Sequence, residues 1–192
     1  MALTEEAICN MALGHLGGLR ITDLDVDDST EAELCNDNYE YCRDFVLESR
    51  DWTFARKRDE ITIDGSAPDF EWKSRFARPD DCITLRRLSN DPTDMEKAEP
   101  YELEGSWILT DTNVLYVIYT EQIIDVTLFS PAFTRALVYF LASVMASALT
   151  DNAKIEDILY RKFERTLEQA GGRDGVQTRP RRVRTTQFKR YR

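Results

Sequence analysis

Acidic side chains are the residues of this sequence most able to do chemistry, and they cluster in two places. One cluster is the run DLDVDD over residues 23–28, and the other is the adjacent pair Asp80 and Asp81. Glycoside hydrolysis needs two carboxyl groups at a suitable separation, so either cluster could supply them. The first run lacks the glycine and the distal glutamate of a calcium-binding loop. Because the chain has 35 acidic residues, chance pairs are common, and the simpler interpretation is a solvated acidic loop carrying Asp23, Asp25, Asp27 and Asp28.

The chain has a single histidine, and any catalytic triad or Cys/His pair would have to use it. His15 lies beside Leu13 and Leu16 in a helical pattern, which predicts a packing role. The sequence contains no GxSxG turn and no Walker pattern, and Gly17-Gly18 stands at a helix end, where phosphate is not captured. We therefore expect no catalytic residue, no cofactor and no enzyme activity.

The four cysteines form no CxxC pair, so no zinc or other metal site is expected. Cys35 and Cys42 are seven residues apart, on one helical face, where we expect them to pack as small hydrophobes. Free cysteines and an N-terminus with acidic rather than basic residues indicate synthesis in a reducing cytosol. The most apolar run, residues 136–149, has 14 residues, which predicts a core helix and no membrane span.

Two helices are predicted in the first 56 residues. The first begins at the N-cap Thr4 and ends at Gly17-Gly18. The second opens at Ser29-Thr30, where Thr30 and Glu33 form a capping box, and stops near Arg50. Its predicted buried side holds Leu34, Tyr41, Phe45 and Trp52.

Two further helices are predicted after residue 126. Ser130 caps the third helix and Pro131 takes its first position. Asp151 or Asn152 caps the fourth, which ends at Gly171-Gly172. The predicted inward residues of the fourth helix are Ile155, Ile158, Leu159, Phe163, Leu167 and Ala170.

The stretch 57–125 has the alternation and turn dipeptides of a β-rich unit. Residues 60–64 and 82–88 are predicted strands, and the polar run 90–99 is a predicted loop. Strands at 101–104, 107–110 and 114–120, with turn residues at both bends, predict a three-stranded antiparallel meander. Six aromatic residues lie in or beside this unit, most as its core and some as possible subunit anchors: Trp52, Phe54, Phe70, Trp72, Phe76 and Trp107.

The order of elements predicts a mainly α, α+β fold. Two helical hairpins pack as a four-helix bundle, and a small antiparallel β-rich insert lies between helices 2 and 3. The predicted divisions are residues 1–56 and 126–172 for the bundle, 57–125 for the insert and 173–192 for an extended C-terminal arm.

The charge of the arm is opposite to that of the rest of the chain. Residues 171–192 carry eight basic side chains against Asp174, a net charge of +7, which leaves −17 for residues 1–170 of a chain whose total is −10. The acidic body argues against nucleic-acid binding by the folded part. We expect the arm to be disordered when free and to order on an acidic partner. Its predicted partner-binding residues are Arg179, Arg181, Arg182, Val183, Arg184, Phe188, Lys189, Arg190 and Tyr191.

Several blocks of the chain resemble one known family. MALGHLG with the following ITDLD, SRDWTFARKRDEITI and RFARPDDCITLRRL are three of them, and SWILTDTNVLYVIYTE before FSPAFTRALVYFLASVMASALT is the fourth. In this order they resemble bacteriophage tail tubular protein A, the head-to-tail adaptor of T7-like podoviruses, over most of residues 8–170. They are structural blocks, and none is a catalytic signature.

The resemblance implies a structural virion protein, made in the bacterial cytoplasm, that forms a dodecameric ring between the portal and the tail nozzle. It also implies a lumen through which the genome passes with only transient DNA contact, and an arm that docks on the portal. Two alternatives stay open. One is a tail-associated glycan or peptidoglycan hydrolase that uses Asp80 and Asp81 or the 23–28 cluster, and the other is a DNA-binding module acting through the basic arm.

Overall fold

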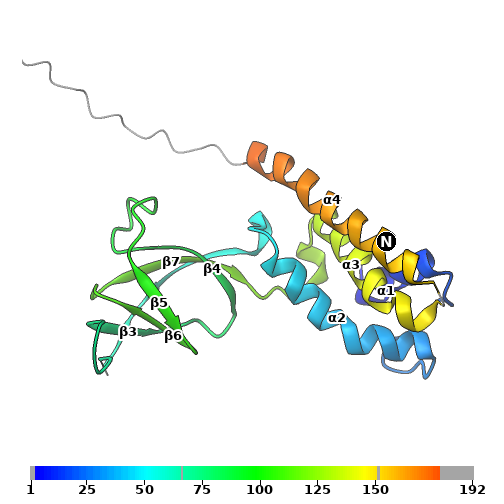
Figure 1. Cartoon of the computed structure of the whole chain (residues 1–192), viewed down its shortest axis with the longest axis horizontal. Helices are drawn as coiled ribbons and strands as arrows, with labels where there is room; N and C mark the ends of the chain where they lie inside the picture. The colour runs from blue at the N-terminus through cyan, green and yellow to red at the C-terminus, as the bar shows by residue number, and fades with distance from the viewer. Residues whose placement is uncertain (1–2, 66, 151, 178–192) are drawn as a thin grey trace, which may run out of the picture.

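The computed structural model describes residues 3–65, 67–150 and 152–177, which form a helical part and a β unit side by side (Figure 1). The helical part consists of α1 (Glu5–Leu16), α2 (Thr30–Glu48), α3 (Pro131–Leu149) and α4 (Ala153–Gln177). Short 3-10 turns at Thr53–Ala55 and Val126–Leu128 lie at the two junctions. The β unit consists of β1 (Arg56–Ile61), β2 (Ile63–Asp64), β3 (Ser74–Ala77), β4 (Cys82–Ser89), β5 (Tyr101–Glu104), β6 (Trp107–Thr110) and β7 (Leu115–Glu121).

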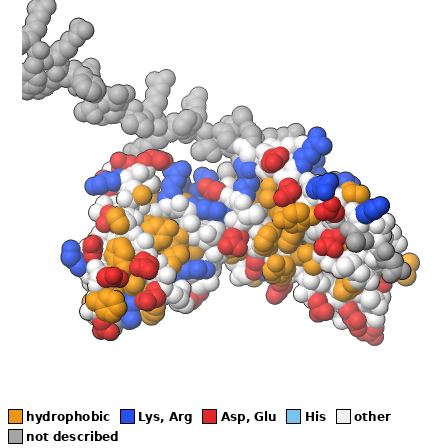
Figure 2. Space-filling model, in the orientation of Figure 1, with side chains coloured by type: hydrophobic (Ala, Val, Ile, Leu, Met, Phe, Trp, Pro, Cys, Tyr) orange, Lys and Arg blue, Asp and Glu red, His pale blue; other side chains and the backbone are white. Residues whose placement is uncertain are grey.

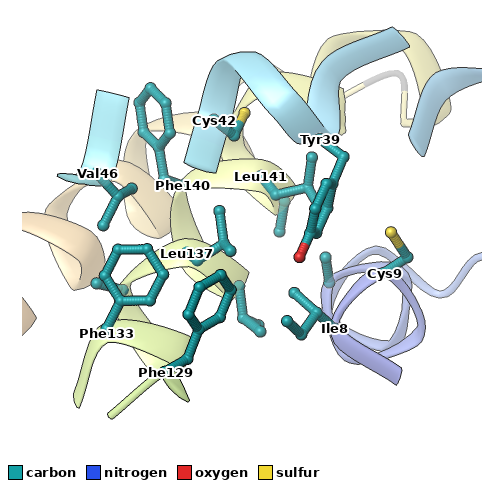
Figure 3. Close-up of a cluster of buried hydrophobic side chains, with 14 of the residues drawn as sticks. Ile8, Cys9, Tyr39, Cys42, Val46, Phe129, Phe133, Leu137, Phe140 and Leu141 are labelled. Carbon is teal, nitrogen blue, oxygen red and sulfur yellow. The ribbon is translucent and has the colours of Figure 1, made fainter. Parts of the chain in front are cut away.

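Helix α3 is the centre of the helical part. It packs extensively against α1, α2 and α4, whereas α1 and α2 contact each other little. Phe133, Leu137 and Leu141 of α3 are fully buried among apolar side chains of α1 and α2, including Ile8 and Val46 (Figure 3). Burial of such side chains stabilises the fold by about 1.5–3 kcal/mol each, so this cluster is the main core.

The helix starts follow local capping chemistry. The Thr4 hydroxyl accepts a hydrogen bond from the Ala7 amide, and Ser130 accepts one from Phe133, as predicted. Gly17 ends α1 in the left-handed conformation (φ 75°), which is also as predicted. The capping box on Thr30 is wrong, because Ser29 is the N-cap of α2 and its hydroxyl accepts from the Ala32 amide.

Two details of the helices differ from the prediction. Helix α4 continues through Gly171 to Gln177 instead of ending at Gly171-Gly172, and Gly171 leaves room for the Arg50 guanidinium, which donates to the Leu167 carbonyl. Of the predicted buried side of α2, Trp52 is buried and Leu34 and Phe45 are partly buried against the core, whereas Tyr41 is 59% exposed. The buried residues of α2 are Ala32, Cys35, Tyr39, Cys42, Arg43, Val46 and Leu47.

Two antiparallel sheets make up the β unit within the described residues. One has the order β1-β7-β4 and the other β2-β3-β6-β5. Phe76 and Ile108 from the second sheet pack against Leu115, Val117 and Tyr119 from the first, which gives the unit a core of its own. The predicted meander is wrong at its last strand. The chain crosses from β6 to the other sheet, where β7 lies between β1 and β4 and is buried along most of its length.

The predicted four-helix bundle with a small insert is therefore wrong. The fold is α+β, with 45% helix, 21% strand and two antiparallel sheets. A single sheet would leave one apolar face in water, whereas two facing sheets cover each other, so the β unit is larger than an appendage. The helices form no regular bundle either, because α1, with 12 residues, and α2 both use α3 as their common support.

One described helix, α3, is long and apolar enough to cross a membrane by length and composition. The apolar helix is thus longer than the 14-residue run from which a core helix was predicted. Slightly more than half of its most apolar window, 56%, is buried inside the protein. Packing against α1, α2 and α4 accounts for its apolar character, as expected for a core helix.

Candidate interaction surfaces

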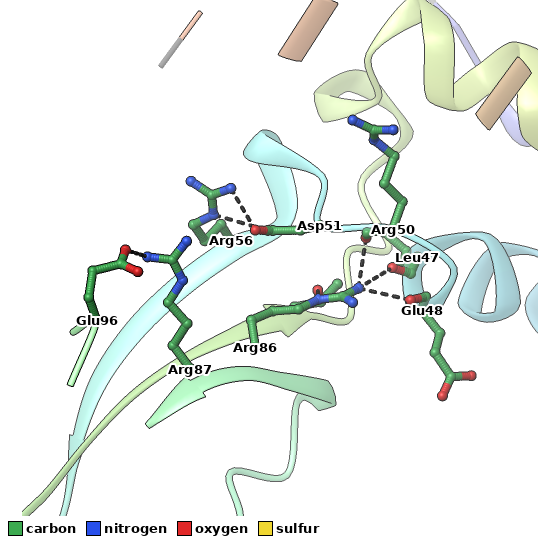
Figure 4. A network of polar contacts seen from close by, with 9 residues as sticks. Leu47, Glu48, Arg50, Asp51, Arg56, Arg86, Arg87 and Glu96 are labelled. Atoms are coloured by element: carbon green, nitrogen blue, oxygen red, sulfur yellow. Dashed lines mark hydrogen bonds and ion pairs between the residues drawn. The ribbon is translucent and has the colours of Figure 1, made fainter. Parts of the chain in front are cut away.

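A polar joint fixes the β unit to the helical part. The guanidinium of Arg86, on β4, donates to the carbonyl oxygens of Glu48 (2.8 Å) and Arg50 (2.7 Å) beyond the end of α2 (Figure 4). These carbonyls have no partner within the helix, and a cation at a helix C-terminus is also favoured by the helix dipole. Arg56 forms a two-pronged ion pair with Asp51 beside it. The joint therefore holds the surfaces of the two parts in a defined relation.

Asp81, one of the predicted catalytic candidates, lies in an ion-pair cluster at the end of one sheet. Lys57 of β1 lies 2.5 Å from Asp81 and 2.9 Å from Glu121, and the Tyr119 hydroxyl donates to Asp81 at 2.9 Å. Partial burial raises the pKa of Asp81, but the hydrogen bonds from Lys57 and Tyr119 outweigh it, so the pKa lies below its usual value. A general acid needs a raised pKa, so the cluster suits tying three strand ends together better than catalysis. Asp80 is exposed and does not join it.

The aspartates of the 23–28 loop are held in local turns. Asp23 accepts from the Asp25 amide and Asp27 accepts from the Ser29 amide. The hydrogen bonds from Ser29 lower the pKa of Asp27, so this carboxyl is ionised. Over the described ranges, no group of three or more His, Cys, Asp or Glu side chains is placed to hold a metal ion. The loop serves as the approach to the N-cap of α2.

His15 is exposed on α1 and contacts Tyr139 of α3 with tilted rings, whose centroids are 5.2 Å apart. Partial burial and the nearby Lys162 lower its pKa, so the ring is neutral near pH 7. It lies at the edge of an apolar depression of about 600 Å³, which the sequence pattern did not indicate. The depression lies between α1 and α3 and is lined by Leu3, Met11, Phe129, Pro131, Thr134, Arg135, Val138 and Tyr139 as well.

All four cysteines are free and buried. Cys35 and Cys42 therefore pack as small hydrophobic residues, as predicted. The Cys35 thiol lies 3.7 Å from the Met145 sulfur of α3. Burial raises the pKa of Cys42 to about 12, which keeps this thiol protonated and unreactive.

The six aromatic residues singled out in the sequence separate into three groups. Trp52 and Phe54 belong to the helical core, where both rings meet Phe133 edge-on, and only Phe76 is in the core of the β unit. Trp72 and Trp107 are half-buried on the β unit, and Phe70 is 77% exposed. Most of the six are therefore not the core of the insert, because β7 supplies that core instead.

Sequence reasoning missed that exposed tyrosines flank a cluster of aromatic rings in the helical part, in which Phe140 and Phe163 are themselves buried. Phe45 stacks on Phe140 at 4.5 Å, and Phe140 also meets Phe163 at 4.9 Å. Tyr41 and Tyr160 flank these rings and are both exposed. We call these five residues the aromatic strip. The α2 part of the strip could be recognised in the sequence, because Tyr41 and Phe45 are four residues apart and so lie on one helical face. We predicted that this face is buried.

Acidic side chains surround the aromatic strip on the α2 side. The only basic residue of α2, Arg43, is 2% exposed and pairs with Asp44. The surface of α2 is therefore acidic, and Figure 2 shows apolar side chains gathering among charged ones on both parts of the molecule. The acidic residues of α2 are Glu31, Glu33, Asp37, Glu40, Asp44 and Glu48.

The predicted partner-binding residues of the arm, Arg179 to Tyr191, all lie outside the described residues. The described backbone ends at Gln177, so residues 173–177 of the predicted extended arm belong to α4. In comparisons with known proteins, no family model and no curated protein matches the chain.

Proposed function

We propose that this protein is a structural head-to-tail adaptor of a phage virion. In this role it forms a ring between the portal and the tail nozzle and contributes no catalytic step. The observation that carries the proposal is the pairing of an acidic body, which exposes aromatic side chains on both of its parts, with an arm of opposite charge. Exposed aromatic groups rimmed by polar ones favour protein interfaces, and the resemblance in the sequence blocks points the same way.

The aromatic strip is the surface that best suits contact between neighbouring subunits. Tyrosine and phenylalanine provide much of the binding energy in protein interfaces when they become buried. In a ring, one such surface meets a different surface of the next subunit, and closure leaves none exposed. The proposed copy number is twelve, as the resemblance implies. An acidic lumen would repel the phosphate backbone, so that DNA slides through with only transient contact and no membrane is involved.

The arm is the part proposed to attach the ring to the portal. Its arginines can form paired hydrogen bonds with carboxylates, and ordering of the arm on binding accompanies burial of its few apolar groups. The residues proposed for this contact are Arg179, Arg181, Arg182, Val183, Arg184, Phe188, Lys189, Arg190 and Tyr191.

A truncation after Gln177 tests the role of the arm, because it removes residues 178–192 and leaves every described element intact. Electron microscopy of portal-bearing capsids mixed with each protein should show a density added by the full chain and none added by the truncated chain. Far-UV circular dichroism of the truncated chain controls for folding. Equal decoration by both proteins would contradict the proposal. The DNA-binding alternative predicts a different result. The full chain would bind duplex DNA with a steep salt dependence, the truncated chain would not, and neither chain would bind capsids.

A further inference from the structure

The strand β5 has a free edge. It pairs only with β6 among the described strands, and all four of its residues are exposed. The turn between them has two residues, Gly105 and Ser106, so Glu104 and Trp107 flank it as a directly bonded pair. Because bonded and non-bonded pairs alternate in an antiparallel ladder, the N–H and C=O groups of Tyr101 and Leu103 point away from β6. This edge can accept another strand.

The side chains of β5 divide by chemistry between its two faces. Leu103 pairs in register with the buried Ile108, so it lies on the face that carries the core, and Tyr101 is on the same face. Their side chains are 48% and 42% exposed. Glu102 and Glu104 are on the opposite face, where Glu102 accepts a hydrogen bond from the Trp72 indole at 3.0 Å.

The edge strand carries two acidic side chains, Glu102 and Glu104. Neither Glu102 nor Glu104 has an ion pair with a lysine or arginine of the described residues. Glutamates on an edge strand prevent pairing with most other strands, and especially with a second copy of the same edge. They favour a strand that places basic side chains opposite them, since opposite charges across a strand pair stabilise it.

A segment of the basic arm has a complementary pattern. Arg182, Val183 and Arg184 alternate basic, apolar and basic, in the same way that Glu102, Leu103 and Glu104 alternate acidic, apolar and acidic. Residues 178–192 contain no acidic side chain that would oppose the glutamates. An antiparallel pairing would place Arg184 opposite Glu102, Val183 opposite Leu103 and Arg182 opposite Glu104.

We infer that the free edge of β5 binds the Arg182–Arg184 segment of a second copy of this chain as a fifth strand of the sheet. The inference rests on the proposed function, in which copies stand beside one another in a ring. It identifies the base of the arm as the segment that contacts the neighbouring subunit. Arg182, Val183 and Arg184 then pair with β5 rather than with the portal, and Phe188, Lys189, Arg190 and Tyr191, which follow them, remain for the portal contact. Strand addition of this kind draws affinity from main-chain hydrogen bonds and specificity from alternate side chains.

Cross-linking between two differently substituted full-length chains tests the pairing directly. One chain carries Leu103→Cys and the other Val183→Cys, and the mixture is oxidised with oxidised glutathione. Residues opposite each other in an antiparallel pair have Cβ atoms about 5 Å apart, which a disulfide can bridge. We expect a covalent dimer of the two chains. A control mixture replaces Leu103→Cys with Val26→Cys, at an exposed apolar position of the 23–28 loop, and should give a yield at least about tenfold lower.

Charge exchange supplies a second test, measured as the cross-linking rate. Glu102→Arg with Glu104→Arg in the first chain should lower the rate about tenfold, since two favourable pairs become repulsive. Adding Arg182→Glu with Arg184→Glu to the second chain should restore it. Equal yields from Val26→Cys and Leu103→Cys, or no restoration on exchange, would overturn the inference.

Failure of this inference is distinguishable from failure of the proposed function. Cross-linking requires only the purified chain, whereas attachment to capsids requires the portal. A chain that cross-links as expected but does not decorate capsids contradicts the adaptor role alone. A chain that decorates capsids without cross-linking contradicts the β5 pairing alone.

Discussion

The Nε of Arg86 donates to the Thr120 hydroxyl at 2.8 Å, while the other end of the same guanidinium binds the carbonyls that follow α2. Arg86 therefore joins two strands, β4 and β7, to the end of a helix more than 30 residues earlier in the chain. Its side chain is half-buried, so water competes only partly for these hydrogen bonds. No other side chain in the described residues is seen to bond three carbonyls of this kind.

Removal of this guanidinium should destabilise the protein markedly. Arg86→Ala leaves the carbonyls beyond α2 without their donor, and hydrogen bonds from charged groups contribute about 1.5–3 kcal/mol each. We expect a loss of about 2–3 kcal/mol in the free energy of unfolding, measured with urea. Arg87→Ala is the matched control, because Arg87 pairs with Glu96 in an exposed ion pair, and it should cost less than about 1 kcal/mol. Equal effects would contradict the role given to the joint.

The Lys57 cluster should make stability depend on pH in a defined direction. The pKa of Asp81 lies below its usual value, so its contribution is present above about pH 4 and is lost as the pH falls through the folded-state pKa. Lys57→Met removes the main hydrogen-bond donor that lowers this pKa. Urea unfolding from about pH 7 down to about pH 2.5 should therefore show a smaller acid-induced loss in the variant than in the parent protein.

Tyr119 provides the control on the alkaline side. Burial, with the hydrogen bond to Asp81, raises the pKa of Tyr119 to about 12. Its contribution is present below about pH 10 and is lost as the pH rises towards the folded-state value. Tyr119→Phe should reduce the alkaline loss of stability and leave the Lys57 contact with Glu121 in place. An unchanged alkaline profile would show that the hydroxyl is not held as described.

Two glycines of the first helix should respond to alanine in opposite directions. Gly14 is inside α1, and an added Cβ would meet nothing within 4 Å, so Gly14→Ala should stabilise by about 0.5–1 kcal/mol. Gly17 has φ of 75°, which an L-residue adopts at a cost of about 1 kcal/mol, so Gly17→Ala should destabilise. Thermal unfolding of both variants measures the difference. A shift of the same sign in both would contradict the helix end at Leu16.

The thiols should be unreactive while the protein is folded. All four cysteines are buried, and the raised pKa of Cys42 further suppresses its thiolate. Labelling with a thiol-exchange reagent in native buffer should be slow and should follow the rate of unfolding, with full labelling in urea. Rapid labelling of any of the four positions, located by mass spectrometry, would show that the core opens far more easily than its packing indicates.

Substitution of the aromatic strip should separate association from folding. Tyr41 and Tyr160 are exposed, so Tyr41→Ser with Tyr160→Ser should change the stability of the monomer by about 0.5 kcal/mol or less each. In the proposed ring these rings are buried, so association measured by sedimentation should weaken at least about tenfold. Val26→Ser is the control at an exposed apolar position on the 23–28 loop and should leave association unchanged. Unaltered assembly of the double variant would exclude the strip as a subunit contact.

Local features of the fold were predictable because their causes are local. The caps at Thr4 and Ser130 and the end at Gly17 depend on a few neighbouring residues, and each is as predicted. The pairing of β7 depends on strands far away in sequence, and no local signal shows that the chain leaves one sheet for the other after Thr110. Periodicity on α2 also left two adjacent stripes to choose from. The predicted stripe was wrong for Tyr41, which is exposed, and it left out Cys35, Tyr39 and Cys42, which are buried.

The candidate surfaces were less predictable than the elements that carry them. The acidic charge of α2 is visible in the sequence, but its meaning as a surface depends on Arg43 being the residue that turns inward. The carboxylates considered for catalysis were identifiable by type alone. The role of Asp81 in an ion-pair cluster depends on Lys57 and Glu121, which are 64 residues apart and meet only in the folded sheet.

Arg56 and Thr120 lie opposite each other on β1 and β7, so the chain enters and leaves the β unit through neighbouring strands. Paired residues in an antiparallel sheet are about 5 Å apart, which a short linker can bridge. The β unit is thus a cassette that could be excised or exchanged without rerouting the polypeptide around α3. Any replacement for this cassette would have to supply its own donor to the carbonyls at the end of α2, which Arg86 now provides.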